Sequence, residues 1–387
     1  MQNFTFYNPT KILFGKGQIA KIGKETKAFG TKALLVYGTG SIKKNGAYDT
    51  VVSSLTNAGI EIVDFPGARS NPVLSHAVAG IELARKEGVD VIVAVGGGSV
   101  IDTAKTIAVG AKTDGDVWKF FTREAVISDA LPILTVVTIS ASASEMNMAA
   151  VITKEQGAQK FSIRSPHIQP KTSVLDPTLL FTLTPQYTAY SSVDIITHML
   201  EGYFNNTEPD SILQDRMVEA LIRTVMESTE TLLTERDHYN ARANIMWAAT
   251  LGFNGLTTAG MGAVALPAHM IEHSLSALYD VPHGAGLSIV LPAWMMYVHE
   301  KRPAKFARFA RRIFHVEKST EIETARNGIE RLKQWFASIG SYTSLADADI
   351  PDSDIAKIAD NALALAKAWG LEDYTLVVIA EILKLGR

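Results

Sequence analysis

The sequence predicts an α/β domain with a parallel, Rossmann-like sheet over residues 1–184, followed by an all-helical domain over residues 185–387. Three observations lead to this prediction. In the first half, short apolar runs alternate with helical segments, which is typical of right-handed β-α-β units. Several of these runs end at glycine-rich breaks, as Val89–Val95 does. Beyond Pro185 the apolar pattern takes a period of 3.6, which indicates helices.

The expected strands of the first half are short and rich in β-branched residues. Their apolar runs are continuous rather than alternating, which fits parallel strands buried on both faces. A helix is expected at 46–58, and another from Asn71 to Lys86 with Pro72 in its first turn, where the missing N–H is harmless. The strands are expected at Phe4–Tyr7, Lys11–Phe14, Lys32–Tyr37, Ile60–Phe65, Val89–Val95, Pro132–Thr138 and Thr172–Leu175.

The second half shows the 3.6-residue pattern almost throughout, and we find neither an internal repeat nor a low-complexity segment in the sequence. Its domain boundary follows the break at Pro185. Helices are expected at 186–205, 209–233, 240–252, 267–279, 286–299, 304–313, 321–338, 353–368 and 374–385.

Composition narrows the class of protein. The formal net charge of −3 gives no electrostatic reason to expect binding to nucleic acid or to a membrane surface. The sequence has no apolar run long enough to span a bilayer, and it starts without a secretory leader pattern. Cysteine is absent, which excludes disulfides and thiolate ligands. We expect a cytoplasmic protein that acts on a small molecule.

Histidines concentrate in one stretch, Pro267–Pro292, which holds three of the nine in the chain. His269 and His273 are four residues apart on an expected helix, so both imidazoles lie on one face. Asp194 and His198 repeat this spacing upstream. One carboxylate and several imidazoles suit a divalent metal such as Fe2+ or Zn2+. The alternative for each pair taken alone is a buried core histidine or a surface hydrogen bond.

A glycine-rich turn follows the strand at Val89–Val95. Gly96, Gly97 and Gly98 precede Ser99 at the start of an expected helix. Backbone N–H groups and the helix dipole at such a turn can hold a pyrophosphate. The alternative is a plain turn with Ser99 as N-cap. The hydroxyl-rich segment 138–145 ends the next strand and suits contact with phosphate or ribose, or else it forms a flexible loop.

The turn after Lys32–Tyr37 bears on the choice of nucleotide. An acidic residue at such a strand end would bind the adenosine ribose and favour NAD. Here Gly38 occupies that place, and Ser41 and Lys43 follow. Small hydroxyls with nearby lysines suit a 2′-phosphate, so we expect NADP to be preferred over NAD.

Three motifs together carry a family resemblance. They are G-G-G-S-x-x-D at 96–102, D-x-x-x-H at 194–198, and H-x-x-x-H at 269–273 followed by P-H-G at 282–284. With them, the whole chain resembles the iron-containing, or group III, alcohol dehydrogenases, in particular the butanol dehydrogenase and broad aldehyde reductase branch. The resemblance implies the fold that this family shares with dehydroquinate synthase, and a homodimer joined through the first-strand region.

The resemblance also implies residue roles. The implied metal ligands are Asp194, His198, His269 and His283, while His273 is similar to a family histidine near the nicotinamide. That histidine is expected to relay a proton or to orient the ring. The positions that match cofactor contacts are Gly38, Gly40, Ser41, Gly97, Gly98, Ser99, Asp102, Thr138, Ser142 and Lys160.

The expected function is metal-dependent hydride transfer between NADP or NAD and small to medium aliphatic aldehydes or primary alcohols. Two alternatives stay open. One is a glycerol dehydrogenase or dehydroquinate synthase-like enzyme on the same fold. The other is a non-catalytic nucleotide-binding protein with a structural metal, whose coordination would be closed to substrate.

Overall fold

The computed structural model describes residues 1–208 and 211–387, and the chain forms two compact units. The unit that holds the sheet comprises Tyr7–Leu183 and Arg236–Thr250. The helical unit comprises Met1–Phe6, Thr184–Glu235 and Leu251–Arg387. The functional roles expected for residues 1–184 and 185–387 stay a prediction.

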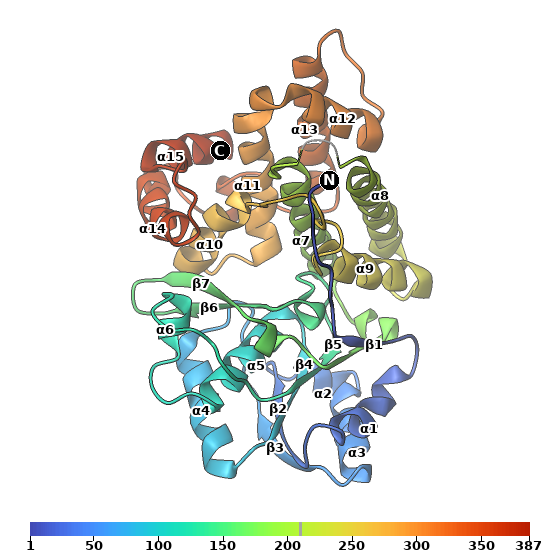
Figure 1. Ribbon diagram of the computed structural model, residues 1–387. Helices are drawn as coiled ribbons and strands as arrows, with labels where there is room; N and C mark the ends of the chain where they lie inside the picture. Colours follow the sequence, from blue (N-terminus) through green and yellow to red (C-terminus); the bar gives the residue numbers. More distant parts are fainter. Residues whose placement is uncertain (209–210) are drawn as a thin grey trace. The chain divides into compact units, whose positions relative to one another are not determined.

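A six-stranded parallel sheet forms the centre of the first unit (Figure 1). The strand order is β1-β8-β5-β4-β2-β3, and every neighbouring pair is parallel. This confirms the predicted Rossmann-like sheet. The strands are β1 (Lys11–Phe14), β2 (Lys32–Tyr37), β3 (Glu61–Phe65), β4 (Val91–Gly96), β5 (Ile133–Val137) and β8 (Thr172–Leu175).

Both faces of this sheet are buried under helices, as the continuous apolar runs predicted. In β4, Ile92 and Ala94 belong to one hydrophobic cluster, with residues of α4 and α5, while Val91, Val93 and Val95 belong to a second, with residues of α1 and α3. Figure 1 shows these two helix pairs on opposite sides of the sheet. The unit's helices are α1 (Ile22–Thr26), α2 (Ser41–Lys44), α3 (Ala47–Asn57), α4 (Leu74–Glu87), α5 (Gly98–Ala111) and α6 (Trp118–Phe121), with most of α9 (Tyr239–Gly252).

Two predicted starts are wrong. Phe4–Tyr7 is not a strand, because its aromatic alternation finds no neighbouring strand and its side chains are exposed. Helix α4 begins at Leu74 rather than Asn71, so Pro72 precedes the helix. The reason is a competing pairing: the carbonyl of Pro72 accepts a hydrogen bond from Thr153 N at 2.8 Å, which holds this segment extended.

That pairing involves an antiparallel hairpin that the sequence analysis missed. Its strands are β6 (Ala149–Lys154) and β7 (Gln159–Arg164). The turn between them is tight, with Gly157 and Ala158 both at positive φ. Lys160, one of the expected cofactor contacts, lies on β7.

The second unit is helical in all its longer elements that the structure describes, as predicted. Thr184 caps α7 by accepting a hydrogen bond from Tyr187 N at 3.2 Å, and Pro185 follows in the first turn. The helix expected at 209–233 starts on two residues outside the described part of the chain, and its remainder is α8. The helices are α7 (Pro185–Phe204), α8 (Ile212–Thr234), α10 (Pro267–Tyr279), α11 (His283–Val298), α12 (Pro303–Phe314), α13 (Glu321–Ser338), α14 (Ile355–Ala368) and α15 (Leu376–Leu385).

None of the helices within residues 1–208 and 211–387 combines the length and apolar character needed to cross a membrane.

Candidate metal centre and nucleotide-binding turn

Helix α7 places Asp194 and His198 on the same face. The two residues are one helical turn apart, and both are almost fully buried. His198 Nδ1 lies 3.1 Å from Asp194 Oδ1. The Phe253 ring covers the imidazole of His198, with ring centroids 4.1 Å apart. The pair is therefore held inside the helical unit and is not a surface hydrogen bond.

Helices α10 and α11 bring two further imidazoles to the same carboxylate oxygen. His269 Nε2 lies 3.5 Å from Asp194 Oδ1, and His283 Nε2 lies 3.8 Å from it. Ligand atoms of Asp194, His198 and His269 all lie within 4.8 Å of one another. The structure thus gathers the four residues that the family resemblance implied, although their role as ligands stays a prediction.

Three polar atoms at the centre of this cluster lack ordinary partners. Asp194 Oδ1, His198 Nδ1 and His269 Nε2 are inaccessible to solvent and make no hydrogen bond to any described residue. One buried polar atom left unpaired costs about 1–3 kcal/mol. Three such atoms that face one another, all nitrogen or oxygen donors, fit a divalent cation of the Fe2+ or Zn2+ type.

The charges in the cluster favour a cation too. Burial by itself would raise the pKa of Asp194, but the facing imidazoles, His198 first, hold it well below its usual value. Burial lowers the pKa of His198 to about 3. Burial would also lower the pKa of His269, but the Glu201 carboxylate raises it to about 10. Near neutral pH the cluster thus contains a carboxylate and a neutral imidazole, and a metal would displace the proton on His269 Nε2.

Two buried glutamates stand behind the imidazoles, and the sequence analysis missed both. Glu201 Oε2 is hydrogen-bonded to His269 Nδ1, and Glu272 Oε2 is hydrogen-bonded to His283 Nδ1. Both carboxylates are fully buried. The sequence could have indicated Glu201, because it lies seven residues after Asp194 and therefore on the same face of α7.

The glycines after His283 allow close packing around it. His283 is the first residue of α11, which begins three residues before the start at 286 that the sequence predicted. A Cβ at Gly284 would collide with the backbone of Tyr190 on α7. A Cβ at Gly286 would lie 2.6 Å from Glu272 Oε1. The P-H-G-x-G pattern therefore marks two points where only a hydrogen fits.

His273 lies beside the cluster rather than at its centre. It is buried one turn beyond His269 on α10. Its ring centroid is 5.7 Å from that of His283 and 5.6 Å from that of Trp369. His273 does not belong to the group of Asp194, His198 and His269, but its ligand atom lies within 4.8 Å of ligand atoms of Glu272 and His283.

In the other unit, the glycine-rich turn and the hydroxyl-rich segment lie against each other. Thr138 N donates to the carbonyl of Gly96 at 3.0 Å. A Cβ at Gly97 would lie 3.0 Å from the Ile139 Cβ, and one at Gly98 would overlap the Ser142 hydroxyl. Helix α5 begins at Gly98 with Gly97 as N-cap, so Ser99 is not the cap. Backbone N–H groups at a helix start of this kind suit a phosphate.

Several side chains expected to touch a cofactor are engaged within the chain. The Asp102 carboxylate accepts hydrogen bonds from the Ser144 hydroxyl at 2.6 Å and from Val151 N at 3.0 Å. The buried Lys160 donates from Nζ to Asn71 Oδ1 at 3.1 Å. The Ser99 hydroxyl donates to a backbone carbonyl in the loop before α4.

The residues after β2 form a separate turn. The carbonyl of Gly38 accepts a hydrogen bond from Gly67 N at 3.2 Å. Gly40 has a φ of 121°, which favours glycine, and Ser41 opens the short helix α2. Two residues on, Lys43 Nζ lies 4.5 Å from the centroid of the Tyr48 ring.

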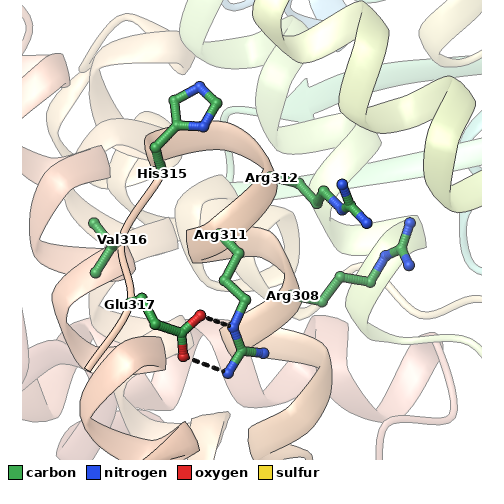
Figure 2. Close-up of a pocket in the computed structure, with 6 residues that line it drawn as sticks. All are labelled: Arg308, Arg311, Arg312, His315, Val316 and Glu317. Carbon is green, nitrogen blue, oxygen red and sulfur yellow. Dashed lines mark hydrogen bonds and ion pairs between the residues drawn. The ribbon is translucent and has the colours of Figure 1, made fainter. Parts of the chain in front are cut away.

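A surface pocket on helix α12 is of a different kind (Figure 2). Arg308, Arg311, Arg312 and His315 line it, together with Val316 and Glu317. Arg311 is paired with Glu317, and Arg308 Nε is 2.6 Å from Glu219 Oε1. The pocket contains none of the predicted site residues.

Comparison with known families covers most of the chain. The model of the family described as "Iron-containing alcohol dehydrogenase" matches residues 9–177. The model described as "Fe-containing alcohol dehydrogenase family, C-terminal" matches residues 188–386.

Individual relatives agree with the family match. The chain is 41% identical over 366 residues to the probable NADH-dependent butanol dehydrogenase 1 of Bacillus subtilis, covering 94% of both chains. It is 36% identical to the NADPH-dependent aldehyde reductase of Escherichia coli, covering 92% of this chain and 91% of the relative. The crystal structure of NADH-dependent butanol dehydrogenase A from Thermotoga maritima superposes with a TM-score of 0.96 at 46% identity, covering 100% of this chain and 99% of that one.

Proposed function

Because this chain belongs to the iron-containing alcohol dehydrogenase family, we propose that it interconverts small to medium aliphatic aldehydes and primary alcohols of the butanol type. The chain is an NAD(P)-linked alcohol dehydrogenase or aldehyde reductase. The substrate range, the ligand set and the preferred nucleotide are the proposal.

One observation carries the proposal: three buried polar atoms, on Asp194, His198 and His269, face one another without hydrogen-bond partners among the described residues. Unpaired buried atoms of this kind destabilise the fold, and a bound cation would satisfy them. We assign Asp194, His198, His269 and His283 as its ligands. When bound, the metal supplies Lewis acidity toward the substrate oxygen.

The chain's own residues supply position and proton transfer. His283 is the most accessible of the four, with 26% of its side chain exposed against 5–7% for the others. We therefore place the substrate on the His283 side of the cluster. His273, whose ring is 5.7 Å from that of His283, is the residue we assign to hold or move a proton there.

Backbone groups at the turn before α5 are proposed to hold the nucleotide pyrophosphate. Gly97 and Gly98 let this turn pack directly against Ile139 and Ser142, and Thr138 N is bonded to the Gly96 carbonyl, so the backbone of the turn is held in place. The side chains of Ser99, Asp102 and Lys160 then shape the site from behind, since each is bonded within the chain. Gly38, Gly40 and Ser41 are proposed to lie near the adenosine ribose.

We propose NADP as the preferred nucleotide. The reason is the charge of Lys43, which lies over the Tyr48 ring beside the proposed ribose turn and suits a 2′-phosphate. The Asp64 carboxylate, the acidic group nearby, is engaged by the Tyr48 hydroxyl, which donates a hydrogen bond to it at 2.7 Å. The relatives differ in the nucleotide that their names give, NADH for the Bacillus protein and NADPH for the Escherichia one.

We also propose a homodimer formed through the first-strand region. β1 lies at the edge of the sheet and pairs with β8 on one side. Beside it in the same unit, Phe14 and Trp247 stack edge to face at 5.8 Å while 38% and 37% exposed. A partner strand would cover both the open edge and these rings.

Use of a nicotinamide nucleotide, which cells keep inside, favours the cytoplasm.

The test is oxidation of NADPH and of NADH with butanal, followed at the nicotinamide absorbance band, on protein loaded separately with Fe2+ and with Zn2+. We expect metal-dependent oxidation of NADPH, with NADH slower. Equal or faster use of NADH would overturn the assignment of NADP but not the enzyme class. Folded protein that binds nucleotide and metal without turnover would favour a binding protein or a synthase-like enzyme.

A further inference from the structure

Two carboxylates lie behind the metal cluster and do not face it. Glu201 on α7 and Glu272 on α10 have no exposed side-chain surface. Each is hydrogen-bonded to the Nδ1 atom of a proposed ligand, His269 for the first and His283 for the second. Burying two charged groups this deeply is unfavourable unless other interactions compensate for their desolvation.

The chemistry of a carboxylate determines the state of each ring. An ionised carboxylate only accepts hydrogen bonds, so the imidazole nitrogen that contacts it carries the hydrogen. The other nitrogen, Nε2, is then the one that can offer a lone pair to a metal, once any proton on it is displaced. In both rings Nε2 is the atom that faces Asp194 Oδ1, at 3.5 Å for His269 and 3.8 Å for His283.

We propose that Glu201 and Glu272 are positioning residues that fix the orientation and tautomer of His269 and His283 and thereby set the affinity of the cluster for its metal. The inference rests on the proposed metal site. Hydrogen bonds of this kind commonly orient metal-bound histidines and raise their basicity.

Glu201 also fixes the start of the helix that carries His269. Its Oε1 accepts hydrogen bonds from the backbone N–H groups of Ala268 at 2.6 Å and His269 at 3.4 Å. Both N–H groups lie in the first turn of α10, whose first residue is Pro267, and N–H groups there have no acceptor within their own helix. One carboxylate on α7 therefore sets both the helix and the ring of the ligand that must meet Asp194.

Glu272 connects α10 to α11 in a similar way. Its Oε1 accepts a hydrogen bond from the hydroxyl of Ser276, one turn along α10. Its Oε2 holds the His283 ring at the start of α11, where Gly286 leaves space for the carboxylate. The two glutamates thus join the three ligand-bearing helices in series.

The two sites should respond differently to glutamine. At Glu201 both oxygens accept from N–H groups, so one donor faces an amide NH2 in either orientation of Glu201→Gln. At Glu272 one partner is a hydroxyl, which can turn and accept. Glu272→Gln can therefore keep its carbonyl on His283, and we expect the smaller effect there.

Glu219 provides a matched control in the same unit. It is also buried, and it accepts a hydrogen bond from the Tyr203 hydroxyl at 2.9 Å and pairs with Arg308. Neither of these partners is a proposed metal ligand. Glu219→Gln therefore removes a buried charge without disturbing an imidazole.

The experiment measures the affinity of metal-free protein for Zn2+ by competition with a chelator, and the visible spectrum with Co2+ as a geometry probe. Thermal unfolding of the metal-free variants gives the structural effect. We expect Glu201→Gln to weaken Zn2+ binding about 10–100-fold and to alter the Co2+ spectrum, with a smaller change for Glu272→Gln. Glu219→Gln should lower stability without changing either metal readout.

Unchanged metal affinity and spectrum in Glu201→Gln would overturn the inference, and so would an equal loss in Glu219→Gln. If Glu201→Gln does not fold, ring nitrogen NMR shifts of wild-type metal-free protein decide the matter. A hydrogen on Nδ1 of both His269 and His283 is required, and a hydrogen on Nε2 alone overturns it. If wild-type protein binds no metal at all, the proposed metal site itself fails.

Discussion

The helical unit and the sheet unit present their predicted sites in opposite ways. In the helical unit, side-chain atoms of Asp194, His198 and His269 meet in the interior and find no hydrogen-bond partner within the described chain. In the sheet unit, the side chains of Asp102 and Lys160 already have partners in the chain. At the turn before α5, the groups proposed to bind the nucleotide are therefore backbone N–H groups.

The difference follows from what each ligand needs. A divalent metal is bound by side-chain lone pairs, so its site concentrates unusual residues and leaves their atoms unpaired. A pyrophosphate is bound by backbone N–H groups, so its site needs space and a fixed turn, and side chains serve to hold the turn. Substitutions should therefore affect metal content in one unit and nucleotide affinity in the other.

The largest expected effect is that of Asp194→Ala. All three imidazoles face the oxygen that this change removes. We expect loss of bound metal and a fall in kcat/KM of at least about 10³-fold, since Lewis-acid stabilisation contributes several kcal/mol. Metal analysis and steady-state rates measure it, while nucleotide binding by fluorescence should stay unchanged. Full metal content in this variant would show that the cluster is not the metal site.

The next effect is expected at Gly98→Ala in the sheet unit. Its new Cβ would overlap the Ser142 hydroxyl, and overpacking of this kind costs about 1–3 kcal/mol. We expect KM for the nucleotide to rise about tenfold, which corresponds to 1.4 kcal/mol, with metal content unchanged. Adding Ser142→Gly should restore much of the affinity, because it removes the atoms that collide. A Gly98→Ala variant with wild-type KM would mean that this turn does not hold the nucleotide.

The sequence predicts much of both regions because their strongest signals are local. The spacing between Asp194 and His198, and the strand that ends in Gly96, are visible within a few residues. The parallel sheet and the change to helices after Pro185 follow from periodicity, and the structure confirms both. Family resemblance supplied His283 as a ligand, and the structure brings it to the cluster.

What could not be predicted depends on partners distant in the chain. Glu201 reads as one glutamate in an apolar helix, and its histidine partner is 68 residues away. Asp102 reads as a cofactor contact, but its partner Val151 N lies on a hairpin 49 residues later that the sequence analysis missed. Phe4–Tyr7 shows the opposite error, since its alternation predicts a strand and no neighbouring strand pairs with it.

A smaller effect is expected for Asp102→Asn, which tests whether this residue serves the turn or the nucleotide. An asparagine cannot accept both hydrogen bonds: its carbonyl can stay on Val151 N only if the Ser144 hydroxyl turns and accepts from the NH2, and the buried charge is lost in either case. We expect a loss of about 1–3 kcal/mol in the free energy of unfolding, with KM for the nucleotide changing only a few-fold. Chemical denaturation and steady-state rates measure the two quantities. A large rise in KM at unchanged stability would instead indicate direct contact between Asp102 and the nucleotide.

The smallest effect is expected for a substitution at Asp90, which lies at the start of β4, away from the proposed nucleotide site at the other end of that strand. Asp90, just before β4, accepts hydrogen bonds from the backbone N–H groups of Thr31 and Lys32, each at 2.9 Å. Burial alone would raise the pKa of Asp90, but these bonds, Thr31 first, hold it below its usual value of 3.8. The native state therefore favours the charged form, and its contribution is present above the unfolded pKa and is lost as pH falls through the lower folded pKa.

Asp90→Asn should then lower stability by only about 1 kcal/mol at pH 7, because the carboxylate is only half-buried and solvent screens its charge. The deficit should begin to shrink as the pH falls below about 3.8 and should vanish below the lower pKa of the folded state, where the native wild-type carboxylate is protonated too. Denaturation of both proteins across this pH range measures it, with nucleotide KM and metal content expected to stay at wild-type values. A change in either functional quantity would mean that the two ends of the sheet are coupled, and the contrast between a side-chain site and a backbone site would then not explain the sheet unit.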